Sequence, residues 1–420
     1  MRARGAFWDR SYPSLRPRPL AGNALDLLCG GDEYFPALER ALDAAQREVF
    51  VETYLFAADP TGWRIAHALA RAARRGVAVH LVIDGFGCAD FEPSLASVLR
   101  ESGVQLAVFR PQPRLWSFER QHLRRLHRKL AVIDGERAFV GGLNLIDDRL
   151  DSNHGALAQP RADFAVALRG PLVAQVHWAA WRLWWQLRLR DAARRLAPWA
   201  GVERRRSLLA TLPAPPLART PPIGRTRAML VLRDNLRLRH AIERAYLRAL
   251  GQARREVLIA SAYFLPGLRF RRALLAALGR GVRVRLMLQG RREYWLPHWA
   301  QQALYEELLA AGAEIVEYHA SFLHAKAAVI DDWATVGSSN IDPFSLLLAR
   351  EANVVVFEAD FARRLRAAIE ALMASGGRPL PAQRHARRPL FARVLQQVAF
   401  VLVRIAVALS GRGGGSLGRY

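Results

Sequence analysis

Lysine is almost absent from this chain. The sequence has 62 lysines and arginines together, and only two of them, Lys129 and Lys326, are lysines. Arginine serves wherever a general positive charge is enough. The two retained lysines therefore indicate positions that need a compact ammonium on a flexible stem rather than a planar guanidinium.

Cysteine and long apolar runs are also scarce. Cys29 and Cys88 lie outside any metal-binding or redox spacing, which argues against a disulfide framework and fits a reducing compartment. The Arg- and Pro-rich N-terminus lacks the apolar core of a secretory signal. No uncharged apolar run reaches the length of about 18 residues that suggests a membrane span. The nearest approach, residues 390–409, is interrupted by two arginines and two glutamines.

Acidic residues are too few to balance the basic ones. The chain has 37 Asp and Glu, a net charge of +25 and a pI near 11.4. Such a surface attracts polyanions, either nucleic acid or an anionic membrane. Its 420 residues, 51% of them hydrophobic, are enough for two or three globular domains.

Both lysines occupy the same position of a repeated motif, which reads H-x-K, four apolar residues and D. The members are His127, Lys129 and Asp134 in the first copy and His324, Lys326 and Asp331 in the second. Each copy is followed by a Gly/Asn turn that contains Asn144 or Asn340. Because the whole pattern occurs twice, we interpret it as a duplicated functional unit.

The duplication extends well beyond the motif. Strand-like residues 47–56 match 255–264, and each run follows an amphipathic helix, expected over 34–45 and 236–250. Further strands are expected at 79–83 and 104–109, and at 284–288 and 313–318. The glycines after Arg75 and Arg280 suit helix C-caps. Both halves thus have the order β-α-β-α-β-β.

This alternation predicts an α/β fold of two tandem lobes with mixed sheets, related by a pseudo-two-fold axis, with the active site at their interface. The Pro-rich stretch between the halves is typical of a linker. The expected divisions are an N-terminal segment (1–21), a first lobe (22–195), a linker (196–224), a second lobe (225–375) and a membrane-associating C-terminal segment with a tail (376–420).

The repeated residues suit phosphoryl chemistry. Residues two apart on a strand point to the same side, so each histidine should emerge beside its lysine. Lysines and asparagine amides can hold phosphoryl oxygens. One imidazole can attack phosphorus while the other protonates the leaving alkoxide. Lysines oppose a bound cation, so we expect no metal and no cofactor. Asp163 and Glu351 are candidates for the acids that orient the histidines.

These motifs resemble the phospholipase D superfamily. Residues 229–235, 262–267 and 333–343 further resemble bacterial cardiolipin synthases, especially the shorter B type without N-terminal spans. The resemblance implies phosphatidyl transfer from phosphatidylglycerol or a similar donor to the hydroxyl of a second phospholipid, through a phosphatidyl-histidine. It also implies structural roles for Asp134 and Asp331, and it favours His127 as nucleophile with His324 as acid and base.

Three segments could serve a lipid substrate. The basic, aromatic loop 110–125 is either an interfacial entrance or an ordinary solvated loop. The helix with Trp178, Trp181 and Trp185 either presents tryptophan and arginine to lipid headgroups, which we favour, or packs in the core. Residues 390–409 could form an in-plane or weakly inserted anchor, a buried helix or a true span.

These features predict a peripheral enzyme on the cytoplasmic face of a bacterial inner membrane. Its expected partners are an anionic membrane surface and phospholipids, namely phosphatidylglycerol and also phosphatidylethanolamine. The alternatives are a phospholipase D-type hydrolase, a nuclease or phosphodiesterase with the same histidines, and a scaffold without activity. The Trp/Arg helix and the apolar C-terminal segment argue against a nuclease, and the two intact motifs argue against a scaffold. The sequence indicates no oligomeric state.

Overall fold

The structure, a computed structural model, describes residues 17–89, 91–111, 125–151, 154–195, 220–234, 238–292, 295–342, 349–386 and 388–411. Most of the expected N-terminal segment and linker, the larger part of the loop 110–125 and the C-terminal tail lie outside the described residues.

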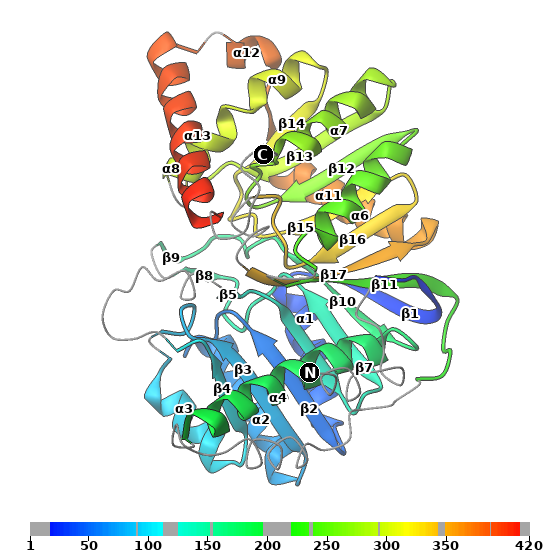
Figure 1. Cartoon of the computed structure of the whole chain (residues 1–420), viewed down its shortest axis with the longest axis vertical. Helices are drawn as coiled ribbons and strands as arrows, with labels where there is room; N and C mark the ends of the chain where they lie inside the picture. The colour runs from blue at the N-terminus through cyan, green and yellow to red at the C-terminus, as the bar shows by residue number, and fades with distance from the viewer. Residues whose placement is uncertain are drawn as a thin grey trace, which may run out of the picture.

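The chain forms two halves whose main strands and helices correspond, except that α8 and α9 stand in the second half where the first has α3 (Figure 1). The first half contains β1 (Leu20–Cys29), α1 (Gly31–Asp43), β2 (Glu48–Thr53), α2 (Pro60–Arg74), β3 (Ala78–Asp84), α3 (Pro93–Glu101), β4 (Gln105–Phe109), β5 (Arg125–Leu126), β6 (Lys129–Ile133), β7 (Arg137–Gly141), β8 (Leu150–Asp151), β9 (Gly155–Ala156), β10 (Phe164–Arg169) and α4 (Val173–Arg195). The second contains β11 (Thr226–Arg233), α6 (Ala241–Gln252), β12 (Glu256–Ser261), α7 (Leu268–Gly279), β13 (Arg283–Gln289), α8 (Trp295–Gln302), α9 (Tyr305–Ala310), β14 (Glu314–Tyr318), β15 (Lys326–Ile330), β16 (Trp333–Gly337), β17 (Ala349–Phe357) and α11 (Ala359–Gly376). After it come β18 (Gly377–Pro379), α12 (Ala382–Ala386) and α13 (Leu390–Gly411).

The two lobes share one continuous sheet. Its order is β18-β14-β13-β12-β15-β16-β17-β11-β1-β10-β7-β6-β2-β3-β4, and the antiparallel pair β1–β11 joins the lobes at the centre. In each half the order outward from this pair is the same. Parallel pairs such as β2–β3 and antiparallel pairs such as β2–β6 occur side by side, so the sheet is mixed, as predicted. The joining of both half-sheets was not expected from the sequence.

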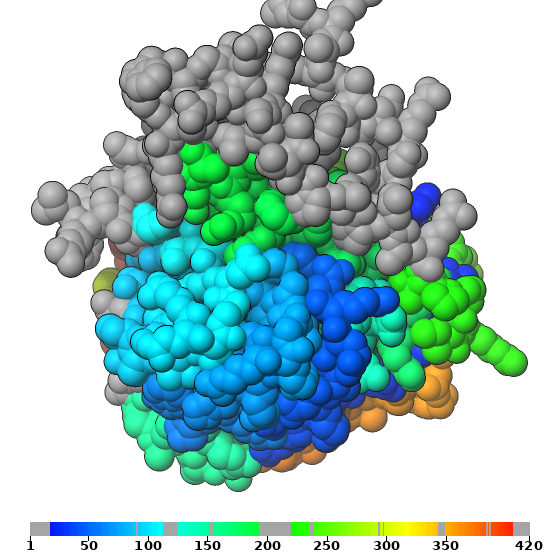
Figure 2. Space-filling view, turned by 90° about the horizontal axis from the view of Figure 1, so that it is seen from below, coloured from blue at the N-terminus to red at the C-terminus, as the bar shows by residue number. Residues whose placement is uncertain are grey.

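Helices cover both faces of each half-sheet. In the first lobe α1, α2 and α3 pack on one face, and α4 packs on the other. Figure 2 looks onto this lobe from below and shows its blue and cyan segments together, with α4 in green to one side. In the second lobe α6, α7 and α9 lie on one face and α11 on the other. The α4 and α11 sides merge into one apolar core that crosses the lobe boundary. This shared core fixes how the lobes face each other.

The two expected C-cap glycines have the conformation that their position requires. Gly76 and Gly281 adopt φ values of 90° and 82°, in the left-handed region that favours glycine. The amides that follow them close the helix ends, since Val77 donates to Ala72 and Val282 donates to Ala277. The helix ends inferred from the repeat are therefore confirmed.

The interpretation of the tryptophan helix as an interfacial element is wrong. In α4, Trp178 and Trp181 are only 4% and 5% exposed and belong to the large apolar core, as does the fully buried Trp184, while Trp185 is half-buried against the same core. Trp178 stacks on Trp181 with ring centroids 5.1 Å apart. These rings are buried because α4 lies across β2, β6 and β7, where large side chains fill the space between helix and sheet. The alternative of core packing is the one the structure supports.

The C-terminal apolar stretch forms α13, which packs along α8. Ala399 and Val403 are buried there with Leu265, Ala300 and Leu304. Up to Ile405, where its side chains are described, most of the other apolar side chains of α13 are exposed, so this part is not a buried helix. Within the described ranges, no helix has the length and apolarity needed to cross a membrane.

Candidate active site

The motif strands β6 and β15 lie in the middle of their half-sheets. β6 is flanked by β2 and β7, and β15 is flanked by β12 and β16. All five residues of each strand are buried, which explains why Leu-Ala-Val-Ile and Ala-Ala-Val-Ile follow the lysines without a polar residue. Lys129 and Lys326 are the first residues of these strands, so both ammonium groups start from equivalent points.

The motif aspartates lie at the opposite ends of the strands. Asp134 and Asp331 adopt left-handed φ values of 56° and 52°. The Asp134 carboxylate accepts hydrogen bonds from the backbone amides of residues 46, 47 and 48, at 2.7–3.0 Å. Asp331 does the same with residues 254, 255 and 256, at 2.9–3.0 Å. With about 3.3 Å per strand residue, both carboxylates are too far from the lysines to take part in their chemistry.

The four remaining catalytic candidates meet where the lobes face each other. His127 Nδ1 lies 3.1 Å from both carboxylate oxygens of Glu351. His324 Nδ1 lies 2.6 Å from Asp163 Oδ2. Each acid comes from the other lobe, so the two pairs cross the interface. The sequence identified both acids but did not indicate which acid serves which histidine.

Backbone pairing between the lobes places each histidine beside its acid. Just before His127, β5 runs parallel to the start of β17, and the His127 amide donates to the Arg350 carbonyl at 3.0 Å. Before His324, Leu323 forms a parallel bridge with Ala162, and the His324 amide donates to the Ala162 carbonyl at 2.8 Å. Arg350 and Ala162 directly precede Glu351 and Asp163, respectively. Each histidine is therefore fixed by main-chain contacts as well as by its acid.

These contacts determine the tautomer of both rings. A carboxylate only accepts hydrogen bonds, so each Nδ1 carries the proton and each Nε2 is free to react. The Lys129 ammonium donates to the His127 carbonyl at 2.9 Å, and Lys326 donates to the His324 carbonyl in the same way. Each lysine is thus held by the main chain of its own histidine. The expected placement of both side chains on one strand is wrong, because β6 and β15 begin only at Lys129 and Lys326.

Tyr54 is a site residue that the sequence reasoning missed. Its ring meets the His127 ring edge-on at 5.0 Å, and the Lys129 ammonium lies 5.2 Å from its centroid. The equivalent position of the second lobe is Ala262, so the two halves differ at this point. Comparing the two repeats for differences as well as identities would have found it.

Burial shifts the ionisation of the whole cluster. It lowers the pKa of His127, and it lowers that of His324 well below the ordinary value, with help from both lysines. It also lowers the pKa of Lys129 to about 7 and raises that of Asp163 to about 6. Burial alone would raise the pKa of Glu351, but His127, Lys129 and Ser338 outweigh it and lower the value. Near neutral pH both imidazoles are therefore uncharged and both acids ionised.

The two Gly/Asn turns differ for a steric reason. A side chain at Gly142 would place its Cβ 2.2 Å from a carboxylate oxygen of Asp163. The equivalent Ser338 fits because Glu351 is longer, and its hydroxyl donates to the Glu351 carboxylate. Ser338 is a second residue that the sequence reasoning passed over, although it stands in the motif. It gives Glu351 a partner that Asp163 lacks at the matching position.

A cavity of about 820 Å³ opens beside His324. Asn144, Asp163 and Tyr54 line it together with phenylalanines and further acidic side chains, namely Phe35, Phe56, Phe86, Phe91, Asp59, Glu92, Asp148 and Asp151. The Asn144 side-chain oxygen accepts a hydrogen bond from the Leu55 amide at 3.2 Å. Asn340 is buried at the equivalent point after β16. The polar and apolar parts of this wall suit a ligand with both characters.

A buried ion pair lies under the first motif. Arg128 contacts Glu52 at 2.8 Å, and both side chains are nearly inaccessible. The equivalent residues of the second lobe are Ala325 and Ala260. This exchange of Arg and Glu for two alanines distinguishes the two motif strands. Elsewhere, no three His, Cys, Asp or Glu side chains among the described residues are grouped as metal ligands would be.

Comparison with known proteins gives consistent matches. The family model described as "Cardiolipin synthase, PLD-like domain" matches residues 38–163 and 246–373. Cardiolipin synthase B of Escherichia coli K12 is 36% identical over 93% of this chain and 90% of its own length. Cardiolipin synthase A of Citrobacter koseri is 28% identical over 90% of this chain and 75% of its own.

Solved structures agree in fold. Phosphatidylserine synthase of Haemophilus influenzae superposes with a TM-score of 0.66 at 13% identity, covering 94% of this chain and 96% of its own. Polyphosphate kinase of Porphyromonas gingivalis superposes with a TM-score of 0.53 at 13% identity, covering 92% of this chain and 53% of its own. At this identity the likeness concerns the fold alone. It extends over nearly the whole chain, so the two-lobed architecture is shared.

Proposed function

This chain belongs to the cardiolipin synthase family with phospholipase D-like domains, and on that basis we propose that it is a phosphatidyltransferase that makes cardiolipin. The observation that carries the proposal is the pair of crossed His–acid contacts with both lysines beside them. We assign half of this composite site to each lobe, 22–195 and 225–375. Neither motif copy is complete without the acid of the other.

His127 is the proposed nucleophile. Its Nε2 attacks the phosphorus of phosphatidylglycerol, a P–N bond forms, and the P–O bond to the glycerol headgroup breaks. The leaving oxygen takes its proton from the Nε2 of His324, which must first be protonated. Asp163 and the anionic phosphate favour that charged form once lipid is bound. The lysines stabilise the charge on the phosphoryl oxygens.

The second step reverses these roles. Neutral His324 takes a proton from the hydroxyl of a second phosphatidylglycerol. The oxygen attacks phosphorus, the P–N bond breaks, and cardiolipin leaves with His127 restored. With phosphatidylethanolamine as donor, ethanolamine leaves in the first step instead of glycerol. Glu351 stabilises the charge that appears on the His127 ring when its Nε2 bonds to phosphorus.

A membrane surface is the proposed place of action. Both substrates are lipids, and the net charge of +25 attracts an anionic bilayer. We propose peripheral attachment at the cytoplasmic face of a bacterial inner membrane. Because the tryptophans of α4 are buried, they do not favour a membrane over nucleic acid as partner. The exposed apolar side chains of α13 and the lipid-synthesising relatives favour the membrane.

The direct test supplies the purified full chain in mixed micelles with labelled phosphatidylglycerol, with and without phosphatidylethanolamine. We expect labelled cardiolipin, and none from His127→Ala. Phosphatidic acid as the sole product would replace the synthase with a hydrolase. Cleavage of DNA with no change in lipid would favour the nuclease.

A further inference from the structure

The helix α13 exposes more apolar surface than any other described helix. Eight of its side chains are between 40% and 75% exposed: Leu390, Phe391, Val394, Leu395, Val398, Val401, Leu402 and Ile405. Scattered exposed apolar residues are ordinary, but a contiguous set of this size marks a contact surface.

The eight side chains form one face. At 100° per residue they fall within a sector of about 140°, with no polar residue of 390–405 among them. The opposite side packs on α8 through Ala399 and Val403. One edge of the exposed face carries Arg393, Gln397 and Arg404. An apolar face with arginines at its margin is the arrangement of a helix lying in a membrane interface.

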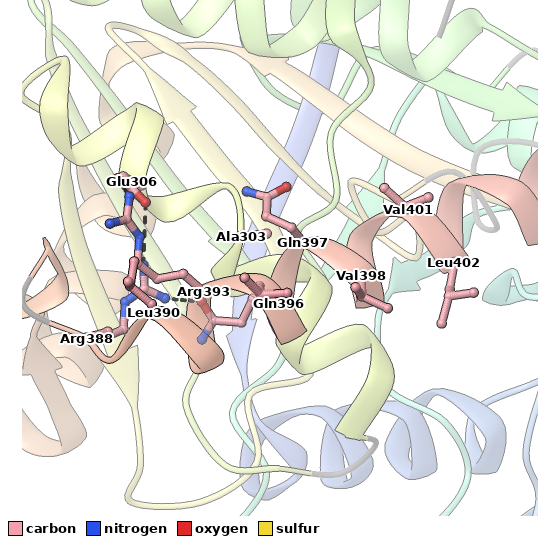
Figure 3. A pocket seen from close by; sticks show the side chains of 11 residues that line it. Ala303, Glu306, Arg388, Leu390, Arg393, Gln396, Gln397, Val398, Val401 and Leu402 are labelled. Atoms are coloured by element: carbon pink, nitrogen blue, oxygen red, sulfur yellow. Dashed lines mark hydrogen bonds and ion pairs between the residues drawn. The ribbon is translucent and has the colours of Figure 1, made fainter.

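A groove beside the helix adds a site for one lipid molecule. It encloses about 580 Å³ between α9 and α13. Figure 3 shows Arg388 and Arg393 near Glu306 at one end and Val398, Val401 and Leu402 at the other. Arg393 contacts Glu306 at 2.6 Å, and Arg388 contacts it at 3.9 Å. Two guanidinium groups share one carboxylate, so this end keeps an excess positive charge, which suits a phosphate.

The face is connected to the catalytic edge of the sheet. Helix α8, which supports α13, follows β13, and the side chain of Gln289 at the end of β13 accepts a hydrogen bond from the Leu323 amide. Leu323 directly precedes His324. Trp295, at the start of α8, is 61% exposed. Figure 1 shows α8 and α13 together at one side of the second lobe.

We propose that the exposed face of α13 docks the protein on an anionic bilayer, with the helix in the plane of the interface and a phospholipid in the groove. Its phosphate lies at Arg388 and Arg393, and an acyl chain lies along Val398, Val401 and Leu402. The inference rests on the proposed lipid substrate, which requires contact with a bilayer. A second copy fits the face less well, because the arginines at its edge and the charge of +25 repel a like-charged molecule.

Vesicle flotation with the full chain tests this docking. The vesicles contain phosphatidylcholine with or without a large fraction of phosphatidylglycerol. The variant Phe391→Gln/Ile405→Gln removes apolar surface from the exposed face at two positions that do not line the groove, without changing charge, and glutamine favours a helix. The matched control is Ile223→Gln, since Ile223 and Ile405 are 48% and 49% exposed. Turnover in detergent micelles and circular dichroism are measured in parallel.

We expect the double variant to bind anionic vesicles at least about tenfold more weakly, while the control binds like wild type. The helix content of the double variant and its turnover in micelles should equal those of wild type. Arg393→Gln should weaken binding about fivefold on anionic vesicles and leave neutral ones unaffected. This second variant tests the docking even where the double variant loses helix content.

Three results would overturn the docking: no vesicle binding by wild type, unchanged binding by both variants, or a shift from dimer to monomer in the double variant without a change in vesicle binding. Wild type that binds vesicles but makes no cardiolipin would refute the proposed function and leave the docking intact.

Discussion

Replacing Glu351 by glutamine should nearly abolish turnover while the fold persists. The side chain is fully buried and its two oxygens are equidistant from His127 Nδ1. Glutamine has nearly the same shape, but its amide nitrogen is a donor. With that nitrogen toward Nδ1, the ring must carry its proton on Nε2, the atom that attacks phosphorus. The imidazolium-like state of the intermediate also loses its negative partner.

The expected loss follows from these two effects. In a serine protease triad, exchanging the orienting aspartate for asparagine lowers kcat about 10⁴-fold. That corresponds to about 5.5 kcal/mol of transition-state stabilisation. Glu351 contacts its histidine through both oxygens and also accepts a hydrogen bond from Ser338, so we expect a loss of about 10³- to 10⁴-fold. Asp163→Asn should cause a similar loss by disturbing His324.

The assay measures cardiolipin formed from labelled phosphatidylglycerol in micelles. Glu136→Gln, a change at a 70% exposed side chain, is the control and should turn over normally. Urea unfolding checks that Glu351→Gln is folded. Turnover of this variant within about tenfold of wild type would refute the argument that Glu351 sets the His127 tautomer.

The remaining predictions concern the lysines, the pH dependence and the buried ion pair. Lys129→Arg and Lys326→Arg should each lose most activity although charge is kept, because a guanidinium cannot take the geometry of the ammonium; near-normal turnover would mean that the scarcity of lysine has no functional meaning. In the free enzyme kcat/KM should fall above about pH 7, where Lys129 loses its proton, and below about pH 6, where Asp163 gains one and no longer supports His324; a profile flat from pH 5 to 9 would contradict these pKa shifts. Glu52→Ala should cost about 3–5 kcal/mol in urea unfolding, because it leaves Arg128 buried without a counter-charge. Glu52→Ala/Arg128→Ala should cost much less, since it reproduces the Ala260/Ala325 pair of the second lobe, and additive losses would contradict this.

The repeat allowed much of the fold to be predicted from the sequence. Strand periodicity, helix patterns and the C-cap glycines gave the α/β class and most strands of each lobe, because these depend on local burial and backbone conformation. The predicted order was wrong at one point in each lobe, because it left out α3 in the first and α8 and α9 in the second. The pairing of β1 with β11 was missed, because strand pairing between distant segments leaves no local pattern. The tryptophans of α4 were misjudged for a related reason. A Trp-rich helix face looks the same in sequence whether a sheet or a membrane covers it.

The candidate site was predicted in composition but not in connectivity. Histidine, lysine and acid types followed from the chemistry of a phosphoryl group. The crossing of Glu351 to His127 and of Asp163 to His324 depends on the short bridges between lobes, which only the tertiary structure reveals. Tyr54 and Ser338 stand at positions where the two repeats differ, so the similarity between the repeats gives no signal for them. An alignment of the two halves shows both differences, Tyr54 against Ala262 and Ser338 against Gly142.

The central claim is that the two lobes form one site in which His127 becomes covalently bonded to the phosphatidyl group. The most direct measurement mixes wild type and His324→Ala with phosphatidylglycerol micelles, quenches the reaction in mild base and locates the adduct by peptide mass spectrometry. We predict a phosphatidyl group on His127 in both proteins, persisting longer in His324→Ala. Product formation without any adduct, or an adduct on a residue other than His127, would contradict the account.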